Sequence, residues 1–129
     1  MNCWFVKSPF KNRGWSDVVV QNRFSLFGIR NHQSKSNIAK MQIGDIALFY
    51  SSSQNKSVYG LMEVSSLPYN DPSSQDERWL SIDFKPLKTF VTPITYEMLK
   101  TIFNDEPFII QPRLSVSCIK NHERVHELI

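Results

Sequence analysis

Residues 45–67, DIALFYSSSQNKSVYGLMEVSSL, decide the fold. Two apolar runs, 45–52 and 58–67, flank the polar tip Ser53-Gln54-Asn55-Lys56. Runs of this kind around a short polar loop predict a β-hairpin. The middle of the chain is therefore expected to be antiparallel β-structure.

Four further segments predict strands. Residues 3–7 form a short apolar run that ends at Ser8-Pro9, and residues 23–28 and 78–87 alternate between polar and apolar side chains. Residues 113–119 form the last expected strand. Alternation with a period of two is typical of a strand with one face in a core, so about six strands are expected.

Helices are expected between these strands. Residues 15–21 predict one or two turns capped by Ser16 or Asp17, and Asn31 caps a helix that runs to about Met41 and is ended by Gly44. Thr95 caps a short helix over 96–103, and Asn121 caps a closing helix. The order of elements predicts an α+β domain with a curved sheet or pseudo-barrel and short peripheral helices.

Length and composition fit one globular domain over residues 1–129. The chain is 41% hydrophobic and 21% charged, which is close to the average of soluble domains. It has neither an apolar run of roughly 20 residues nor a secretory signal. We expect a cytoplasmic protein with no membrane partner, in which Cys3 and Cys118 are reduced.

The charge is unevenly distributed. Residues 1–44 carry seven Lys and Arg against the single acid Asp17, a net +6, whereas the remainder carries −3. Two interpretations stay open: the N-terminal third faces an anionic partner such as a phosphate backbone, or it is a solvated basic face.

One string of residues suggests catalysis. His122-Glu123-Arg124-Val125-His126 is a literal HExxH, the pattern of a zinc hydrolase. Only three residues follow it, and the third histidine of the chain, His32, is far away in sequence. A terminal helix packed through Val125 is the simpler interpretation. With no nucleophile elbow or phosphate loop either, we predict a non-enzyme with no catalytic residue, no metal and no cofactor.

Aromatic side chains point to recognition instead. They are spread among basic and amide-bearing residues such as Lys7, Arg30 and Asn31. Aromatic rings stack on bases, and amides bind base edges. The alternative is that most of these rings belong to the core. The aromatic residues concerned are Trp4, Trp15, Phe24, Phe27, Tyr50 and Trp79.

Seven motifs in order give the chain a family resemblance. They are WFVKSP at 4–9, GIRN at 28–31 with Gln33 and Asn37, MQIGDIALFYSS from Met41, YGLMEV from Tyr59, YNDPS from Tyr69, the Trp79 and Asp83 pair, and RLSV at 113–116. Over almost its whole length this series resembles the EVE domain family.

The resemblance implies a PUA-like pseudo-barrel of about six mostly antiparallel strands, related to YTH and ASCH domains. It also implies a pocket between the first strand, the GIRN segment and the last strand, in a family regarded as readers of DNA or RNA, several of them of modified bases. The implied pocket residues are Lys7, Ser8, Trp15, Leu26, Phe27, Gly28, Arg30, Asn31, Gln33, Asn37, Tyr50, Ser51, Arg113, Leu114 and Ser115. The residues expected to contact the nucleic-acid backbone are Lys11, Arg13, Arg23 and Lys35.

Departures from the family pattern bear on the ligand. Leu26 stands where the family has a tryptophan two residues before the glycine, and Ser51 stands where it has a histidine. A leucine cannot stack on a base as a tryptophan does. The sequence therefore leaves open a reader of a modified base, a protein-interaction domain with a degenerate pocket and, as a remote alternative, a zinc hydrolase that uses the HExxH segment. It does not choose between DNA and RNA or indicate an oligomeric state.

Overall fold

The computed structural model describes residues 1–11, 13–53 and 55–129. The strands are β1 (Cys3–Lys7), β2 (Phe24–Leu26), β3 (Ile46–Ser51), β4 (Ser57–Val64), β5 (Tyr69–Asn70), β6 (Leu80–Thr95) and β7 (Val116–Ile119). The helices are α1 (Trp15–Gln21), α2 (His32–Lys40), α3 (Tyr96–Ile102), α4 (Pro107–Ile110) and α5 (His122–His126).

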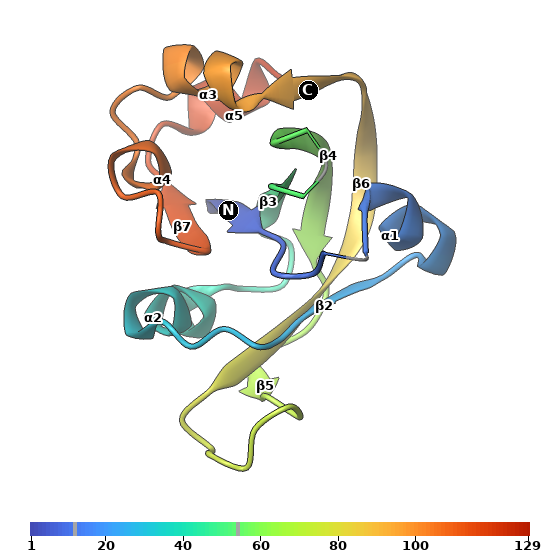
Figure 1. The fold of residues 1–129 in the computed structure, drawn as a ribbon, viewed down its shortest axis with the longest axis vertical. Helices are drawn as coiled ribbons and strands as arrows, with labels where there is room; N and C mark the ends of the chain where they lie inside the picture. Colours follow the sequence, from blue (N-terminus) through green and yellow to red (C-terminus); the bar gives the residue numbers. More distant parts are fainter. Residues whose placement is uncertain (12, 54) are drawn as a thin grey trace.

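The strands form one curled mixed sheet in the order β2-β6-β4-β3-β1-β7, with β5 paired to β6. Every pairing is antiparallel except that of β1 with β3. Figure 1 shows β6 running diagonally across the molecule, with short helices around the sheet. The predicted α+β pseudo-barrel of mostly antiparallel strands is confirmed.

Two apolar cores lie on opposite faces of the sheet. Strand β3 is buried at all six positions because β1 and β4 flank it and both of its faces are covered. Neighbouring residues of β1 belong to different cores: Trp4 packs with Phe49 in one, and Phe5 packs with Leu48 in the other. This division follows from the two-residue period of a strand.

The core of Trp4 is closed by α1 and α2, which contribute Trp15, Val18 and Ile38. The core of Phe5 is closed by the C-terminal helices, to which Leu99 and Val125 belong. Within the described residues, no helix is long and apolar enough to cross a bilayer.

Three predicted helix caps are confirmed. The side chains of Asn31, Thr95 and Asn121 accept hydrogen bonds from the backbone N–H groups of Ser34, Met98 and Arg124, at 2.9, 3.2 and 3.3 Å. Such caps satisfy N–H groups that have no partner within the helix.

Helix α1 spans the expected residues, Trp15–Gln21, but the expected cap at Ser16 or Asp17 was wrong. Its N-cap is Gly14, and Asp17 lies inside the first turn, where its carboxylate accepts from the Gly14 N–H at 2.9 Å. Helix α2 ends at Lys40 with Met41 as its C-cap, as expected, but Gly44 does not end the helix and lies in the following turn with a φ of 96°.

Other boundaries shift as well. Strand β6 continues eight residues beyond the expected end at Leu87, up to Thr95. The expected strands 23–28 and 113–119 shorten to Phe24–Leu26 and Val116–Ile119. The hairpin of β3 and β4 is confirmed, although Gln54 of its predicted tip lies outside the described residues.

Candidate nucleic-acid interface

A cavity of about 220 Å³ opens where β1 and β3 end and β7 is about to begin. The Ser8 N–H donates to the Tyr50 carbonyl and the Lys7 N–H donates to the Ser115 carbonyl, both at 2.8 Å. These bonds fix the three segments relative to one another. We call the cavity the Ser8 pocket, lined by Lys7, Ser8, Pro9, Phe10, Lys11, Ser52, Ser53 and Ser115.

A cluster of two phenylalanines and one arginine borders this pocket. The rings of Phe10 and Phe27 are half-buried and lie 4.6 Å apart between centroids. The Arg13 guanidinium lies over both, 4.9 Å from the Phe10 centroid and 5.7 Å from that of Phe27. Phe10 was missed by the sequence analysis, although an aromatic residue directly after KSP was the available signal.

Two further cavities adjoin the Ser8 pocket. The first, of about 240 Å³, is the Tyr96 pocket, lined by Phe5, Lys7, Tyr50, Ser52, Lys56, Tyr96, Phe108 and Pro112. The second, of about 360 Å³, is the Arg113 pocket, lined by Asn31, Gln33, Ile110, Gln111, Pro112, Arg113 and Leu114. The three cavities are neighbours. Lys7 and Ser52 line both the Ser8 pocket and the Tyr96 pocket, and Pro112 lines both the Tyr96 pocket and the Arg113 pocket.

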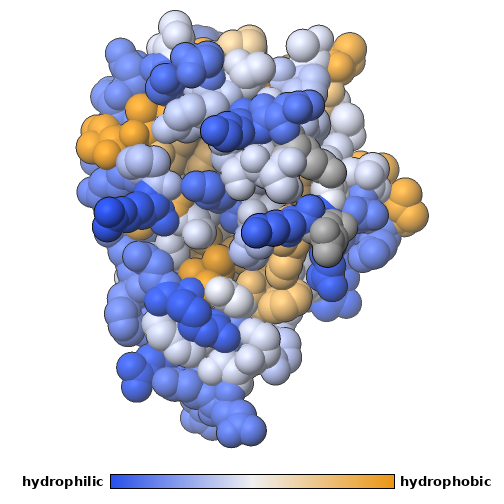
Figure 2. Space-filling model, viewed as in Figure 1, coloured by the Kyte–Doolittle hydropathy of each residue, from blue (hydrophilic) through white to orange (hydrophobic). Residues whose placement is uncertain are grey.

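The three linings contain four cations and no carboxylate. The cations are Lys7, Lys11, Lys56 and Arg113. Among the residues that the structure describes, none of the four forms an ion pair, whereas Arg23, Arg30 and Arg124 pair with aspartates. Cations around these cavities that lack an acidic partner favour an anionic ligand. In Figure 2, apolar surface is set among hydrophilic side chains on the face seen in Figure 1.

Helix α2 holds the start of β7 in place. The Ser34 hydroxyl accepts from the N–H groups of Ser115 and Val116, at 3.2 and 3.3 Å. The Asn37 amide donates to the Val116 carbonyl at 2.8 Å. Asn31 caps the same helix, so both asparagines make structural contacts beside the interface.

Gly28 and Arg30 are held by a buried carboxylate in the loop between β5 and β6. One Asp71 oxygen accepts from the Gly28 N–H at 2.7 Å and from the Arg30 guanidinium at 2.9 Å. Burial acts to raise the pKa of Asp71, but hydrogen bonds from Ser73, Arg30 and Gly28 outweigh it and lower the pKa to about 2. Arg30 also lies over the Trp79 ring, 5.5 Å from its centroid.

The structure brings some of the expected residues together. Lys7, Ser8, Lys11 and Ser115 line the Ser8 pocket. Asn31, Gln33, Arg113 and Leu114 line the Arg113 pocket, and Tyr50 lines the Tyr96 pocket.

Other expected residues lie elsewhere. Leu26 is 0% exposed within the core, and Ser51 is 1% exposed. Trp15 is 5% exposed and donates from its indole nitrogen to the Thr89 hydroxyl at 2.8 Å, and it borders a separate apolar cavity beside α1. Arg23 pairs with Asp83, and Lys35 lines none of the three cavities.

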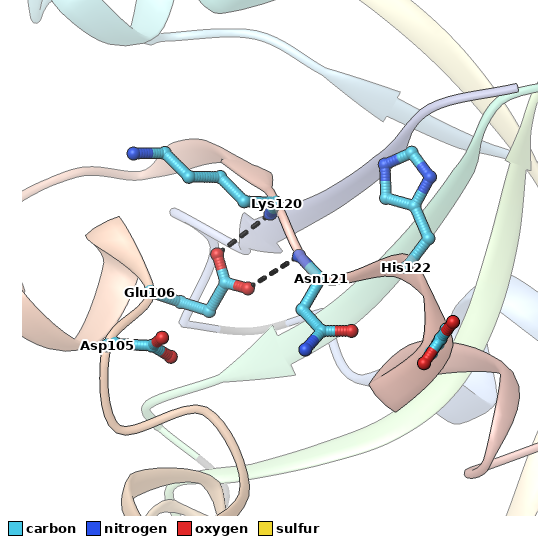
Figure 3. Close-up of a pocket in the computed structure, with 6 residues that line it drawn as sticks. Asp105, Glu106, Lys120, Asn121 and His122 are labelled. Carbon is cyan, nitrogen blue, oxygen red and sulfur yellow. Dashed lines mark hydrogen bonds between the residues drawn. The ribbon is translucent and has the colours of Figure 1, made fainter.

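The HExxH segment lies in α5, beside a separate open pocket (Figure 3). There the Glu106 carboxylate accepts from the backbone N–H groups of Lys120 and Asn121, at 2.8 and 2.9 Å, while the His122 ring points away from it. Glu106 therefore fixes the turn between β7 and α5. No group of three or more His, Cys, Asp or Glu is placed to hold a metal ion in the described part of the chain.

Comparisons with known proteins agree on one family. The family model described as EVE domain matches residues 2–128. A Rhodopseudomonas palustris protein solved by NMR is 27% identical, with a TM-score of 0.87 over 99% of this chain and 90% of its own. Human THYN1, solved in complex with 5-methylcytosine containing DNA, is 21% identical, with a TM-score of 0.86 over 99% of this chain and 96% of its own.

A more distant likeness extends to the ASCH protein of Zymomonas mobilis, which is 11% identical with a TM-score of 0.57 over 98% of this chain and 95% of its own. No curated protein sequence matches the chain. The match of the family model over nearly every residue shows that the chain belongs to the EVE domain family.

Proposed function

We propose that this protein is a non-catalytic module that binds nucleic acid and holds one modified nucleobase in the Ser8 pocket. The observation that carries the proposal is the chemistry of the three adjoining pockets. Four cations without ion-pair partners in the described residues line them, no carboxylate does, and an aromatic ring lies in the Ser8 pocket. Cationic grooves with exposed aromatic rings are typical of proteins that bind single-stranded nucleic acid.

The Ser8 pocket suits a single base. Its volume of about 220 Å³ is below the roughly 300 Å³ at which pockets for larger ligands begin. The Phe10 ring offers a stacking surface. The Ser8 hydroxyl accepts from the Phe10 N–H at 3.3 Å, which leaves its own O–H to donate to a base edge. A base that enters such a pocket is single-stranded or flipped out of a duplex.

The human relative supports the class of ligand. THYN1 has been solved with 5-methylcytosine containing DNA, and it shares the fold of this chain at 21% identity. A methylated cytosine is therefore the first modified base to test here.

The test is binding of labelled oligonucleotides that differ only in one base, cytosine or 5-methylcytosine, as single and double strands of DNA and RNA. Binding to single strands is expected to weaken with salt at a log–log slope of about −0.7 per neutralised phosphate. If all four cations contact phosphates, the slope is about −3, and a fourfold rise in salt lowers affinity about 50-fold.

Two matched variants locate the site. Lys11→Ala should reduce the salt slope by about 0.7. Lys120→Ala, which changes an exposed lysine of the separate pocket beside α5, should leave the slope unchanged. Phe10→Leu should lower affinity for the preferred base about tenfold, since stacking on one ring contributes about 1–3 kcal/mol. Equal losses in Lys11→Ala and Lys120→Ala would contradict the assignment of the site.

A second candidate function is a protein-interaction domain. The cavity beside α1 is lined by Trp15, Val19, Val20 and other residues, and Val20 is 85% exposed. Apolar side chains gathered on a surface often mark contact with another protein. Absence of any nucleic-acid binding at low salt would favour this function.

A further inference from the structure

The Tyr96 pocket lies directly beside the Ser8 pocket and is of similar size. The volumes are about 240 and 220 Å³, and Lys7 and Ser52 line both cavities. Two neighbouring cavities of similar volume that share a lysine suit a ligand made of repeated units, such as a chain of nucleotides.

The floor of the Tyr96 pocket is aromatic. Phe5 and Phe108 stack face to face at 4.0 Å, and Tyr50 lies 5.3 Å from Phe5. All three side chains are buried. Burial raises the pKa of the Tyr50 phenol, and Tyr96 raises it further, so the phenol is uncharged at neutral pH and the aromatic floor carries no charge.

The rim of the pocket is built where the hairpin meets α3. The Tyr96 N–H donates to the Lys56 carbonyl at 2.9 Å, which holds the half-buried Tyr96 ring and Lys56 at the same opening. On the other side, the Lys7 ammonium donates to the Pro112 carbonyl at 3.3 Å. The lining of the pocket therefore includes the Tyr96 side chain and two lysines, Lys7 and Lys56.

We infer that the Tyr96 pocket binds the nucleotide adjacent to the base held in the Ser8 pocket. Its base contacts Tyr96, and the phosphate that joins the two nucleotides lies against Lys7 and Ser52, the residues common to both cavities. Lys56 neutralises the outer phosphate. The inference rests on the proposed function and makes it more specific: the ligand is a single strand of at least two nucleotides, not an isolated base.

The experiment compares three probes by NMR chemical-shift titration: the nucleoside 5-methyldeoxycytidine, and the two dinucleotides of 5-methylcytosine with thymine in either order, each with a terminal phosphate on its thymidine. One of the two dinucleotides should bind at least about tenfold more tightly than the nucleoside, because it adds one stacked base, the linking phosphate and the outer phosphate. It should also shift the amides of Tyr96 and Lys56, which the nucleoside should not.

Variants show whether the gain comes from this pocket. Tyr96→Leu should bring the ratio of dinucleotide to nucleoside affinity close to one, and Lys56→Ala should lower it severalfold. The controls are Tyr59→Leu, a half-buried tyrosine beside α1, and Lys88→Ala, an exposed lysine of β6. Thermal unfolding checks that every variant is folded.

The outcomes separate the two proposals. A dinucleotide gain that disappears in Tyr96→Leu and persists in Tyr59→Leu supports the second site. This inference is overturned if the nucleoside binds and neither dinucleotide binds more tightly than it. It is also overturned if Tyr96→Leu and Tyr59→Leu reduce the affinity ratio of dinucleotide to nucleoside equally. Either result leaves the proposal for the Ser8 pocket intact. Failure of all three probes to bind overturns the proposed function and this inference with it.

Discussion

The buried carboxylate of Asp71 offers the sharpest test of how the GIRN segment is held. Its two oxygens accept four hydrogen bonds, from the Gly28 N–H, the Arg30 guanidinium and both the N–H and hydroxyl of Ser73, at 2.6 to 2.9 Å. Asp71→Asn keeps the shape of the side chain and removes its charge. Arg30 stays 40% exposed, so water can hydrate its charge after the substitution.

The size of the effect follows from the pKa. The pKa of Asp71 falls from 3.8 to about 2 on folding, and each pKa unit corresponds to about 1.4 kcal/mol. The carboxylate therefore contributes about 2 kcal/mol to the free energy of unfolding at neutral pH. Because the folded-state pKa is depressed, this stability is present above pH 4 and is lost as the pH falls through 2. At pH 3 about half of it remains.

Urea unfolding followed by tryptophan fluorescence measures the difference. Asp71→Asn should lower the free energy of unfolding by about 2 kcal/mol at pH 7 and by about 1 kcal/mol at pH 3. The control is Asp76→Asn, which changes an exposed carboxylate in the same loop and should alter stability little. If Asp71→Asn is as stable as the original protein at pH 7, or its loss is the same at both values of pH, the assigned role of the carboxylate is refuted.

Two further substitutions test the core. In Gly60→Ala the new methyl group would overlap the Trp15 ring and lie 2.7 Å from the Lys88 carbonyl oxygen, so we expect a loss of about 1–3 kcal/mol in urea unfolding; a neutral variant would mean that Trp15 does not pack on this strand. Trp4→Phe removes the indole N–H that donates to Asp45 at 3.0 Å, and we expect a loss of about 1–2 kcal/mol by the same assay. The Trp4→Phe prediction fails if stability is unchanged.

Elements with a strong local signal were predictable from the sequence. The hairpin and the three helix caps at Asn31, Thr95 and Asn121 depend on contacts within a few residues, and the first strand is indicated by its own short apolar run. The structure confirms all of them. The PUA-like fold was predicted from the family resemblance, because seven motifs in the same order are specific to one family whereas each motif alone is weak.

Features set by distant contacts were not predictable. Strand β6 extends past Leu87 because β4 pairs with it as far as Thr95, and irregular register in that pairing accommodates Pro86 and Pro93 within a strand. Helix α4 has only four residues, too few to show a periodic pattern. The parallel pairing of β1 with β3 joins segments some 40 residues apart, and no local pattern indicates it.

The candidate site illustrates the same limit. Lys7, Ser8 and Ser115 were identified because they lie in motifs, and the structure places them around one cavity. Arg30 was expected at the pocket because it is basic and belongs to the GIRN motif. Its partner Asp71 lies 41 residues away in sequence, and only the fold brings this buried carboxylate to it.

The leucine at position 26 follows from strand geometry. Phe24 and Leu26 of β2 lie opposite Phe84 and Ile82 of β6, and all four side chains are enclosed in the core. A side chain at position 26 with this orientation packs in the apolar core, and this burial favours an aliphatic residue such as leucine. Phe27, the next residue, lies outside this set and packs against Phe10 at the edge of the Ser8 pocket. The aromatic surface beside the pocket thus comes from residues 10 and 27. Under the proposed function, these two rings, and not the side chain at position 26, offer the surface on which a base would stack.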